Sequence, residues 1–139
     1  MTGKRSLLTK ISEKIRKSKN TVFLREDFSS LGDYDQVGRA LSKLVARGRL
    51  VRIGKGLYAK ARLNRITGAK MLAAPGGFDQ VSKEALNRLG VNWAPGRAEV
   101  AYQNGSTQIP SQTVVRVYGR FNRQISYRNY RLKVEAVKA

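Results

Sequence analysis

The chain has 139 residues, 41% of them hydrophobic, which suits one ordinary domain or two very small ones with a modest core. Lysine and arginine number 28 against 9 aspartates and glutamates, and the formal net charge of +19 favours a polyanionic partner such as nucleic acid over a merely solvated basic surface. The lack of cysteine excludes disulfides and thiolate nucleophiles, and the lack of histidine excludes Ser-His triads and the imidazole ligands of most zinc sites.

Short elements follow one another at the start of the chain. Apolar residues at helical spacing predict an amphipathic helix over 6–18, which is expected to face a core rather than a membrane. A brief strand is predicted over 21–24. A short helix is then predicted over 25–31, and Gly32 is expected to end it as a C-cap with positive φ.

A longer amphipathic helix is predicted next. It is expected to begin after Asp33 or Asp35 as N-cap and to run to about Arg47, where Gly48 closes it. Its predicted inner face consists of Val37, Ala40, Leu41, Leu44 and Val45. The polar residues between them are therefore expected to face solvent.

A hairpin is predicted after this helix, because strand-like runs over 50–53 and 57–59 flank Gly54-Lys55-Gly56. Helix, short strand, short helix, tight turn, longer helix and hairpin, in this order within about 55 residues, are typical of a winged helix-turn-helix. We therefore expect a DNA-binding module in which the longer helix enters the major groove and the hairpin is the wing.

The predicted contacts follow from that geometry. Gln36 is expected to read adenine and Arg39 guanine, whereas Lys43 and Arg47 extend toward the backbone. Glycines on either side of Lys55 are expected to let the wing come close to the duplex. Tyr34 is expected either to stack on the DNA or to be a packing staple at the helix start. The predicted DNA-binding residues are Tyr34, Gln36, Arg39, Lys43, Arg47, Arg52 and Lys55.

The texture of the sequence changes after residue 60. Helices are predicted over 69–74 and 80–89. Enrichment in β-branched and aromatic residues predicts a small antiparallel sheet built from the segments 101–102, 113–118, 124–127 and 130–134. The predicted fold class is α+β, with a winged helix-turn-helix domain over 1–60 and a small α+β domain over 61–139 that ends in this sheet.

Arginine and aromatic residues alternate over 116–123 and 127–133. Such interleaving suits nucleic acid, but an equally simple interpretation has Tyr130, Leu132 and Val134 as the buried face of a sheet. The additional residues expected to contact DNA or an acidic partner protein are Lys4, Arg5, Arg116, Arg120, Arg123, Arg128 and Arg131. Trp93 is interpreted as a structural anchor.

Three segments carry a resemblance to a known family. They are the run Val37 to Tyr58, which reads V-x-x-A-L-x-x-L-x-x-x-G-x-L-x-R-x-x-x-G-x-Y, the helix end Ala85-Leu86-Asn87-Arg88-Leu89-Gly90, and the loop Asn104 to Pro110. In these segments the chain resembles the AbiEi-like antitoxins of type IV toxin-antitoxin systems. The resemblance implies a winged helix-turn-helix regulator that binds inverted repeats in its own promoter and counters a nucleotidyltransferase-like toxin.

Catalysis is not expected. The acidic residues are scattered, so no pair is placed to hold magnesium, and the glycine-rich segments do not match a phosphate-binding loop. No catalytic residue, metal or small-molecule cofactor is predicted. No signal-peptide or membrane-span pattern is found, so a cytoplasmic, nucleoid-associated bacterial protein is expected.

The predicted function is sequence-specific repression of transcription through double-stranded DNA, with the protein acting on its own promoter. Two alternatives remain open, a protein-interaction module that neutralises a toxin and an RNA-binding protein. A recognition helix favours DNA, because the major groove of A-form RNA is too narrow for it.

Overall fold

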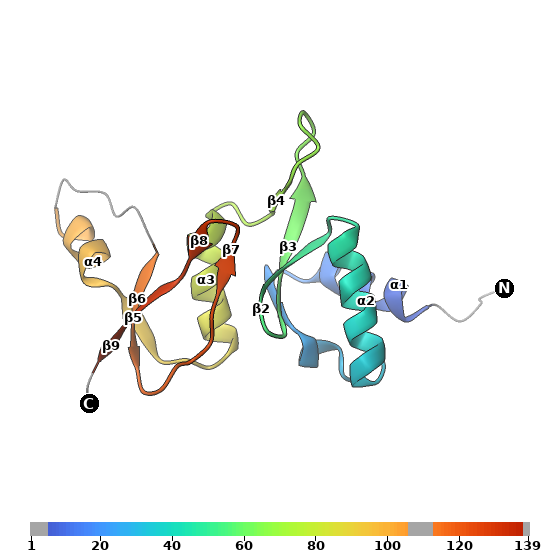
Figure 1. Ribbon diagram of the computed structural model, residues 1–139, viewed down its shortest axis with the longest axis horizontal. Coiled ribbons are helices and arrows are strands. Elements are labelled where there is room, and N and C mark those ends of the chain that lie inside the picture. The colour runs from blue at the N-terminus through green and yellow to red at the C-terminus, as the bar shows by residue number, and fades with distance from the viewer. Residues whose placement is uncertain (1–5, 106–112, 138–139) are drawn as a thin grey trace.

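The chain forms an α+β fold in the computed structural model, which describes residues 6–105 and 113–137 (Figure 1). The helices are α1 (Leu7–Lys17), the 3-10 turn η1 (Arg25–Phe28), α2 (Tyr34–Ala46), α3 (Gly77–Arg88) and α4 (Arg97–Gln103). The strands are β1 (Val22–Leu24), β2 (Leu50–Gly54), β3 (Leu57–Leu63), β4 (Lys70–Leu72), β5 (Trp93–Pro95), β6 (Val114–Tyr118), β7 (Ser126–Tyr127), β8 (Tyr130–Arg131) and β9 (Lys133–Val137).

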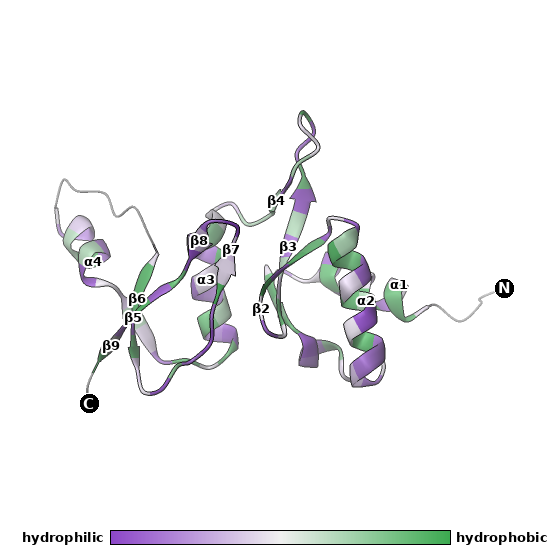
Figure 2. Cartoon of the chain, viewed as in Figure 1, coloured by the Kyte–Doolittle hydropathy of each residue, from purple (hydrophilic) through white to green (hydrophobic). Residues whose placement is uncertain are grey.

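Both long helices of the first part form where the sequence predicts them. Ser6 caps α1 by accepting a hydrogen bond from the Thr9 amide at 3.1 Å. Asp33 caps α2 and forms a capping box with Gln36. Gly48 closes α2 as predicted, and its φ of +77 is the left-handed conformation common just after a helix. The mixed green and purple of α2 in Figure 2 is that of an amphipathic helix.

The predicted helix over 25–31 is wrong in type and length. Only the 3-10 turn Arg25–Phe28 forms, and the Asp27 carboxylate closes it by accepting from the Leu24 amide at 2.8 Å. Gly32 does not have the positive φ expected of a C-cap. A Cβ there would lie 2.9 Å from Leu7 Cδ2, so the glycine allows the close approach of α1 instead.

The first sheet has the strand order β1-β3-β2, and β4 pairs with the end of β3. The helix predicted over 69–74 is wrong, because this segment forms β4 and pairs Leu72 with Ala61. Pairing with β3 and burial of Leu72 outweigh the helical preference of the alanines around it. The domain boundary proposed at residue 60 falls inside β3.

The C-terminal sheet has the order β5-β6-β9 and is not purely antiparallel. β5 and β6 are antiparallel, as are β7 and β8, but β9 runs parallel to β6. The chain reverses twice between β6 and β9, the second time at the β7–β8 turn, where Arg128 has φ +55. The strand expected at 101–102 lies in α4, and the one expected at 130–134 is divided between β8 and β9.

The first sheet is covered on both faces. One hydrophobic cluster joins Phe23, Leu50 and Tyr58 to α1, η1 and α2. The other joins the opposite face of the same strands to α3 and the C-terminal sheet, with Trp93 packed at its margin as the predicted anchor. The first sheet therefore separates the two hydrophobic clusters and contributes residues to both.

Polar contacts also attach α3 to the first sheet. The Glu84 carboxylate accepts from the amides of Thr21 and Val22 at 2.7 and 2.6 Å and from the Thr21 hydroxyl at 2.7 Å. Arg88 forms an ion pair with Asp27 of η1. Such charge-assisted bonds satisfy the edge amides of β1 and fix α3 against it. Among the described helices, none is long and apolar enough to cross a membrane.

Candidate functional site

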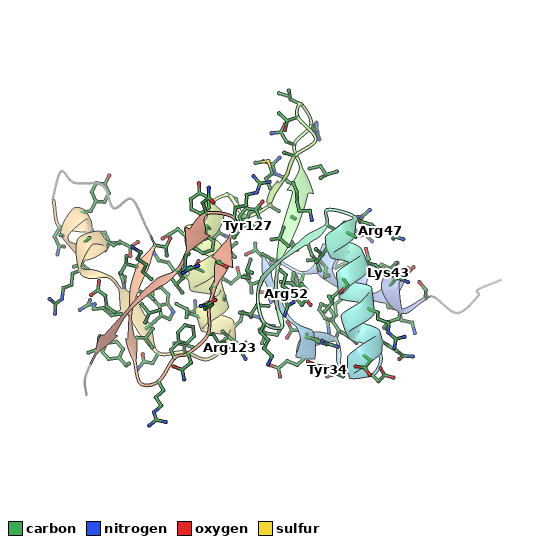
Figure 3. The ribbon with its side chains drawn as sticks, viewed as in Figure 1. Tyr34, Lys43, Arg47, Arg52, Arg123 and Tyr127 are labelled. Carbon is green, nitrogen blue, oxygen red and sulfur yellow. The ribbon has the colours of Figure 1, made fainter. Side chains whose placement is uncertain are left out.

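A cleft lies between α2 and the β2–β3 hairpin, with a volume of about 630 Å³. Five of the seven predicted DNA-binding residues line it, namely Tyr34, Arg39, Lys43, Arg52 and Lys55. Figure 3 shows Tyr34 and Arg47 at opposite ends of α2, Lys43 between them and Arg52 on the neighbouring hairpin. The structure thus brings together cations from a helix and a hairpin that are separate in sequence.

The amphipathicity of α2 places these side chains outside. Val37, Ala40, Leu41 and Leu44 are buried against the sheet, so Arg39 is turned to solvent. The other predicted residues of α2 and the hairpin are exposed as well. Gln36 and Arg47 are exposed without lining the cleft.

Gln36 has a second role that bears on its predicted contact with adenine. Its side-chain Oε1 accepts a hydrogen bond from the main-chain amide of Asp33 at 3.3 Å, and its main-chain amide donates to Asp33 Oδ1 at 2.8 Å. A bidentate contact with adenine needs both the donor and the acceptor of the side-chain amide. Reading adenine in this way therefore requires Gln36 to give up its part of the capping box.

Arg25 belongs to the cleft, and the sequence prediction missed it. Its guanidinium carbon lies 3.4 Å from the centroid of the Tyr34 ring, and its Nε donates to the Tyr34 carbonyl at 3.1 Å. Tyr34 is 69% exposed, so its ring packs on this cation rather than in the core. A Cβ on Gly38 would overlap the guanidinium. A glycine in the middle of a predicted helix was the signal that another group approaches closely.

The tip of the β2–β3 hairpin is held by the C-terminal part of the chain. Arg123 Nη1 donates to the Lys55 carbonyl at 3.0 Å. A Cβ on Gly54 would lie 2.7 Å from the Gln124 carbonyl oxygen, so Gly54 allows this approach of the protein's own chain. Gly56 has φ +67, the left-handed conformation that this tight turn requires, and a Cβ added there would meet no atom within 4 Å.

Comparison with protein families covers nearly all of these residues. A family model described as a family of unknown function, DUF6088, matches residues 10–133. The chain belongs to the DUF6088 family. Comparison with curated proteins gives no match. The matched range contains α2, the hairpin and Arg123, so the whole cleft lies within the DUF6088 region.

The additional predicted residues of this DUF6088 chain do not form one surface. Arg123 lines a second cleft of about 310 Å³ together with Arg25, Tyr34 and Lys55. Arg116 is half-buried and donates to the Pro95 carbonyl at 2.9 Å. Arg128 donates to the Lys70 carbonyl. Arg120 and Arg131 are exposed on the 119–125 loop and on β8, and Lys4 and Arg5 lie outside the described residues.

The buried face expected from Tyr130, Leu132 and Val134 is wrong at two positions. Leu132 is buried, but Tyr130 is 59% exposed and Val134 is also exposed. The alternation fails because the chain leaves β8 at Leu132 before it enters β9, so the three residues do not share one strand. Tyr130 stacks on Phe78 with ring centroids 5.8 Å apart.

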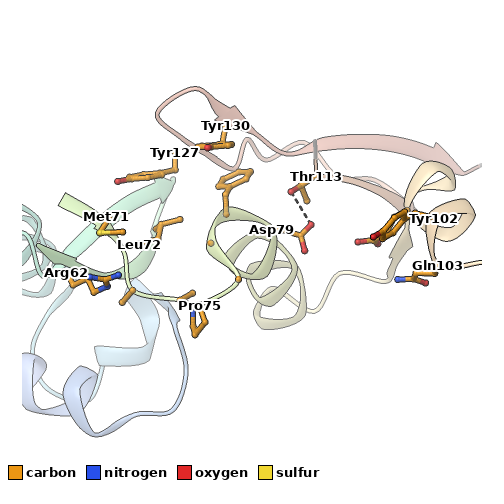
Figure 4. A pocket seen from close by; sticks show the side chains of 16 residues that line it. Arg62, Met71, Leu72, Pro75, Asp79, Tyr102, Gln103, Thr113, Tyr127 and Tyr130 are labelled. Atoms are coloured by element: carbon orange, nitrogen blue, oxygen red, sulfur yellow. Dashed lines mark hydrogen bonds between the residues drawn. The ribbon is translucent and has the colours of Figure 1, made fainter. Parts of the chain in front are cut away.

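A further pocket of about 860 Å³ lies between α3, α4 and the β7–β8 hairpin (Figure 4). Asp79 and Glu99 are among its lining residues, and Asp79 accepts from the Thr113 hydroxyl at 3.2 Å. Both carboxylates pair with Lys83. Burial by itself lowers the pKa of Lys83, but the bonds and charges of Glu99 and Asp79 outweigh it and hold that pKa above its ordinary value.

Metal binding finds no support in the part of the chain that the structure describes. No group of three or more acidic, histidine or cysteine residues is placed to hold an ion there.

Proposed function

We propose that this DUF6088 chain is a bacterial sequence-specific DNA-binding repressor that reads double-stranded DNA with a winged helix-turn-helix. In this proposal residues 6–60 are the module, α2 is the recognition helix and the β2–β3 hairpin is the wing. The order α1-β1-η1-α2-β2-β3 and the position of α2 beside the hairpin support it.

The convergence of cations in the cleft carries the proposal. Arg25, Arg39, Lys43, Arg52 and Lys55 line it together with a single carboxylate, that of Asp35. Like charges gathered in a concave surface raise the local potential and attract a polyanion. Such a cluster is costly without a partner, and phosphates spaced along a duplex neutralise it.

Each part of the cleft has a role on the duplex. Arg39, on the outer face of the N-terminal half of α2, is placed to bond a guanine edge in the major groove. Lys43 and Arg47 continue along the helix toward the phosphate backbone. Lys55 at the hairpin tip reaches the adjacent phosphates. Tyr34, held by Arg25, offers an exposed ring to a sugar or base.

The resemblance to AbiEi-like antitoxins adds two further elements. The operator is an inverted repeat in the protein's own promoter, and the protein partner is a nucleotidyltransferase-like toxin. An α-helix as the reading element favours DNA over RNA. Copurification with the product of an adjacent toxin gene tests the second element separately.

Hydroxyl-radical footprinting on the DNA upstream of the chain's own gene tests the repressor proposal. We expect two protected half-sites related by inversion, with centres a whole number of helical turns apart, because two copies read them from one side of the duplex. Uniform weak protection along the whole fragment would contradict sequence-specific binding.

A further inference from the structure

An arm projects from the first sheet beyond the C-terminal end of α2 (Figure 1). We define the arm as residues 62–70, the end of β3 and the start of β4 with the turn between them. Ile66 at its tip is 94% exposed, and Leu63 is 52% exposed. A single exposed apolar side chain is ordinary on a protein surface, but Ile66 lies on a projecting turn next to the exposed Arg65.

Hydrogen bonds close the turn at the tip of the arm. Asn64 Oδ1 accepts from the amides of Ile66 and Thr67 at 2.8 and 3.0 Å, which makes an Asx turn. The main chain closes the same turn, since the Gly68 amide donates to the Asn64 carbonyl and the Asn64 amide to the Ala69 carbonyl, both at 2.8 Å. These bonds define the main-chain conformation that carries Ile66.

The base of the arm is fixed relative to α2. Lys70 Nζ donates to the Val45 carbonyl at 2.7 Å. The Leu63 side chain packs so closely on Gly48 that a Cβ there would lie 2.9 Å from Leu63 Cδ2. Tyr127 of β7 braces the other side by donating its hydroxyl to the Lys70 carbonyl at 3.1 Å. A ligand bound to α2 therefore meets the arm in one defined position.

The charge around the arm identifies its partner. Residues 36–78, which comprise α2 from Gln36 onward, the hairpin, the arm and the segment leading to α3, contain ten lysines and arginines and no acidic residue. Arg62 and Arg65 of the arm are exposed. A second copy of this chain would meet the arm with like charge, whereas the duplex that α2 binds is a polyanion continuous with the same surface.

We propose that the arm enters the minor groove next to the major groove occupied by α2, and that Ile66 inserts between two base pairs and kinks the duplex. Apolar side chains at rigid tips unstack minor-groove steps in this way, and arginines beside them hold the phosphates. The inference rests on the proposed function and adds DNA bending to it.

Because the chain has no cysteine, a single one can carry a chemical nuclease. Ile66→Cys is coupled to iron-EDTA and bound to the DNA upstream of the chain's own gene. We expect cuts on both strands offset in the 3′ direction, as for a radical source in the minor groove. Lys133→Cys in β9 is the matched control and should not cut. No cleavage from position 66 on bound DNA, or an offset in the 5′ direction, would overturn the inference.

A bending assay separates this inference from the proposed function. With donor and acceptor dyes at the ends of the same duplex, we expect wild type to shorten their separation and Ile66→Ala to lose most of that change, with affinity roughly tenfold lower. Equal bending by both proteins, or no bending by wild type, would reject the wedge and leave the repressor standing. Failure of wild type to bind the duplex would reject the repressor instead.

Capture of a protein is the competing role for the arm. Loss of an acidic copurifying protein from Ile66→Ala, with DNA bending unchanged, would assign the arm to that partner and overturn the DNA inference. The thermal unfolding midpoint of Ile66→Ala is expected to equal that of wild type, because the side chain is 94% exposed.

Discussion

Arg123 donates a hydrogen bond from Nη1 to the main-chain carbonyl of Lys55 at 3.0 Å, so a loop near the C-terminus holds the tip of the β2–β3 hairpin. Gln124 lies directly against Gly54 of the same hairpin. Tyr127 makes the corresponding contact with Lys70 at the base of the arm. The C-terminal part thus braces both hairpins of the first sheet, which gives it a mechanical role in the proposed interface.

Arg123→Ala should loosen the hairpin tip without unfolding the protein. Loss of one charge-assisted bond is worth about 1 to 2 kcal/mol, or roughly tenfold faster hydrogen exchange of amides 54–56. Exchange measured by mass spectrometry on the protein without DNA checks this. Arg120→Ala, an exposed arginine of the same loop, is the control and should leave the rate unchanged. Equal exchange in Arg123→Ala and wild type would show that the brace has no effect on the hairpin.

Arg39→Ala should relax specificity. Loss of a bidentate guanine contact costs about 1 to 3 kcal/mol against the operator and much less against a scrambled duplex. Fluorescence anisotropy titrations of both duplexes measure the two affinities. Arg97→Ala removes an exposed cation from α4, at the other end of the molecule, and controls for net charge (Figure 1). Unchanged affinity and selectivity of Arg39→Ala would show that α2 is not the reading element.

Lys55→Ala should weaken binding to all duplexes alike. One phosphate contact contributes about 0.9 to the slope of log affinity against log salt, so the slope should fall in magnitude by about one. Titrations at a series of salt concentrations give the slope. Lys133→Ala removes the same charge from an exposed residue of β9 that does not line the cleft, and the slope should stay as in wild type. A slope equal to that of wild type in Lys55→Ala would remove the hairpin tip from the interface.

Gly38→Ala should weaken DNA binding without lowering the stability of the fold. Alanine is favoured over glycine inside a helix by about 1 kcal/mol, so the urea unfolding midpoint should stay or rise. The new Cβ displaces the Arg25 guanidinium from the Tyr34 ring, and affinity for DNA should fall severalfold. Because both changes act on Arg25, Gly38→Ala combined with Arg25→Ala should lose no more than Arg25→Ala alone. Additive losses would show that Gly38 acts by another route.

Lys83 should make stability depend on alkaline pH. Its pKa is raised in the folded state, so the stabilisation is complete below the ordinary value of 10.5 and is lost as pH rises through the raised value. Lys83→Met should therefore be less stable than wild type at neutral pH, and the difference should shrink only as pH rises above 10.5. Urea unfolding across this range measures it, with Lys10→Met as the exposed control. A difference independent of pH would contradict the assignment.

The elements that were predicted correctly are specified by residues close together in the sequence. The apolar spacing and caps of α1 and α2, and the glycines of the β2–β3 hairpin, act within a few residues and specify those elements. The segment 69–74 was misassigned because its strand forms only through pairing with Ala61–Leu63, a tertiary contact that overrides the preference of alanine. The parallel pairing of β9 with β6 is non-local in the same way.

The candidate site could also be predicted only where local sequence signals specify it. The exposure of Arg39, Lys43 and Arg52 follows from periodicity alone. Arg25 was not found, because its place depends on η1 bringing it over Gly38 and against Tyr34. The capping bond of Gln36 could be read from the Asp33-x-x-Gln36 spacing, which the base-reading interpretation did not use.

Sequence-specific binding of DNA can be measured by competition between nucleic acids. A labelled duplex from upstream of the chain's own gene is bound at physiological salt, and an unlabelled copy, a scrambled duplex of equal composition and an RNA hairpin of equal length are titrated against it. We expect displacement by the upstream duplex at concentrations at least about a thousandfold lower than by the scrambled duplex or the RNA. Equal displacement by all three would mean that the charge acts without reading sequence, and would contradict the proposed repressor.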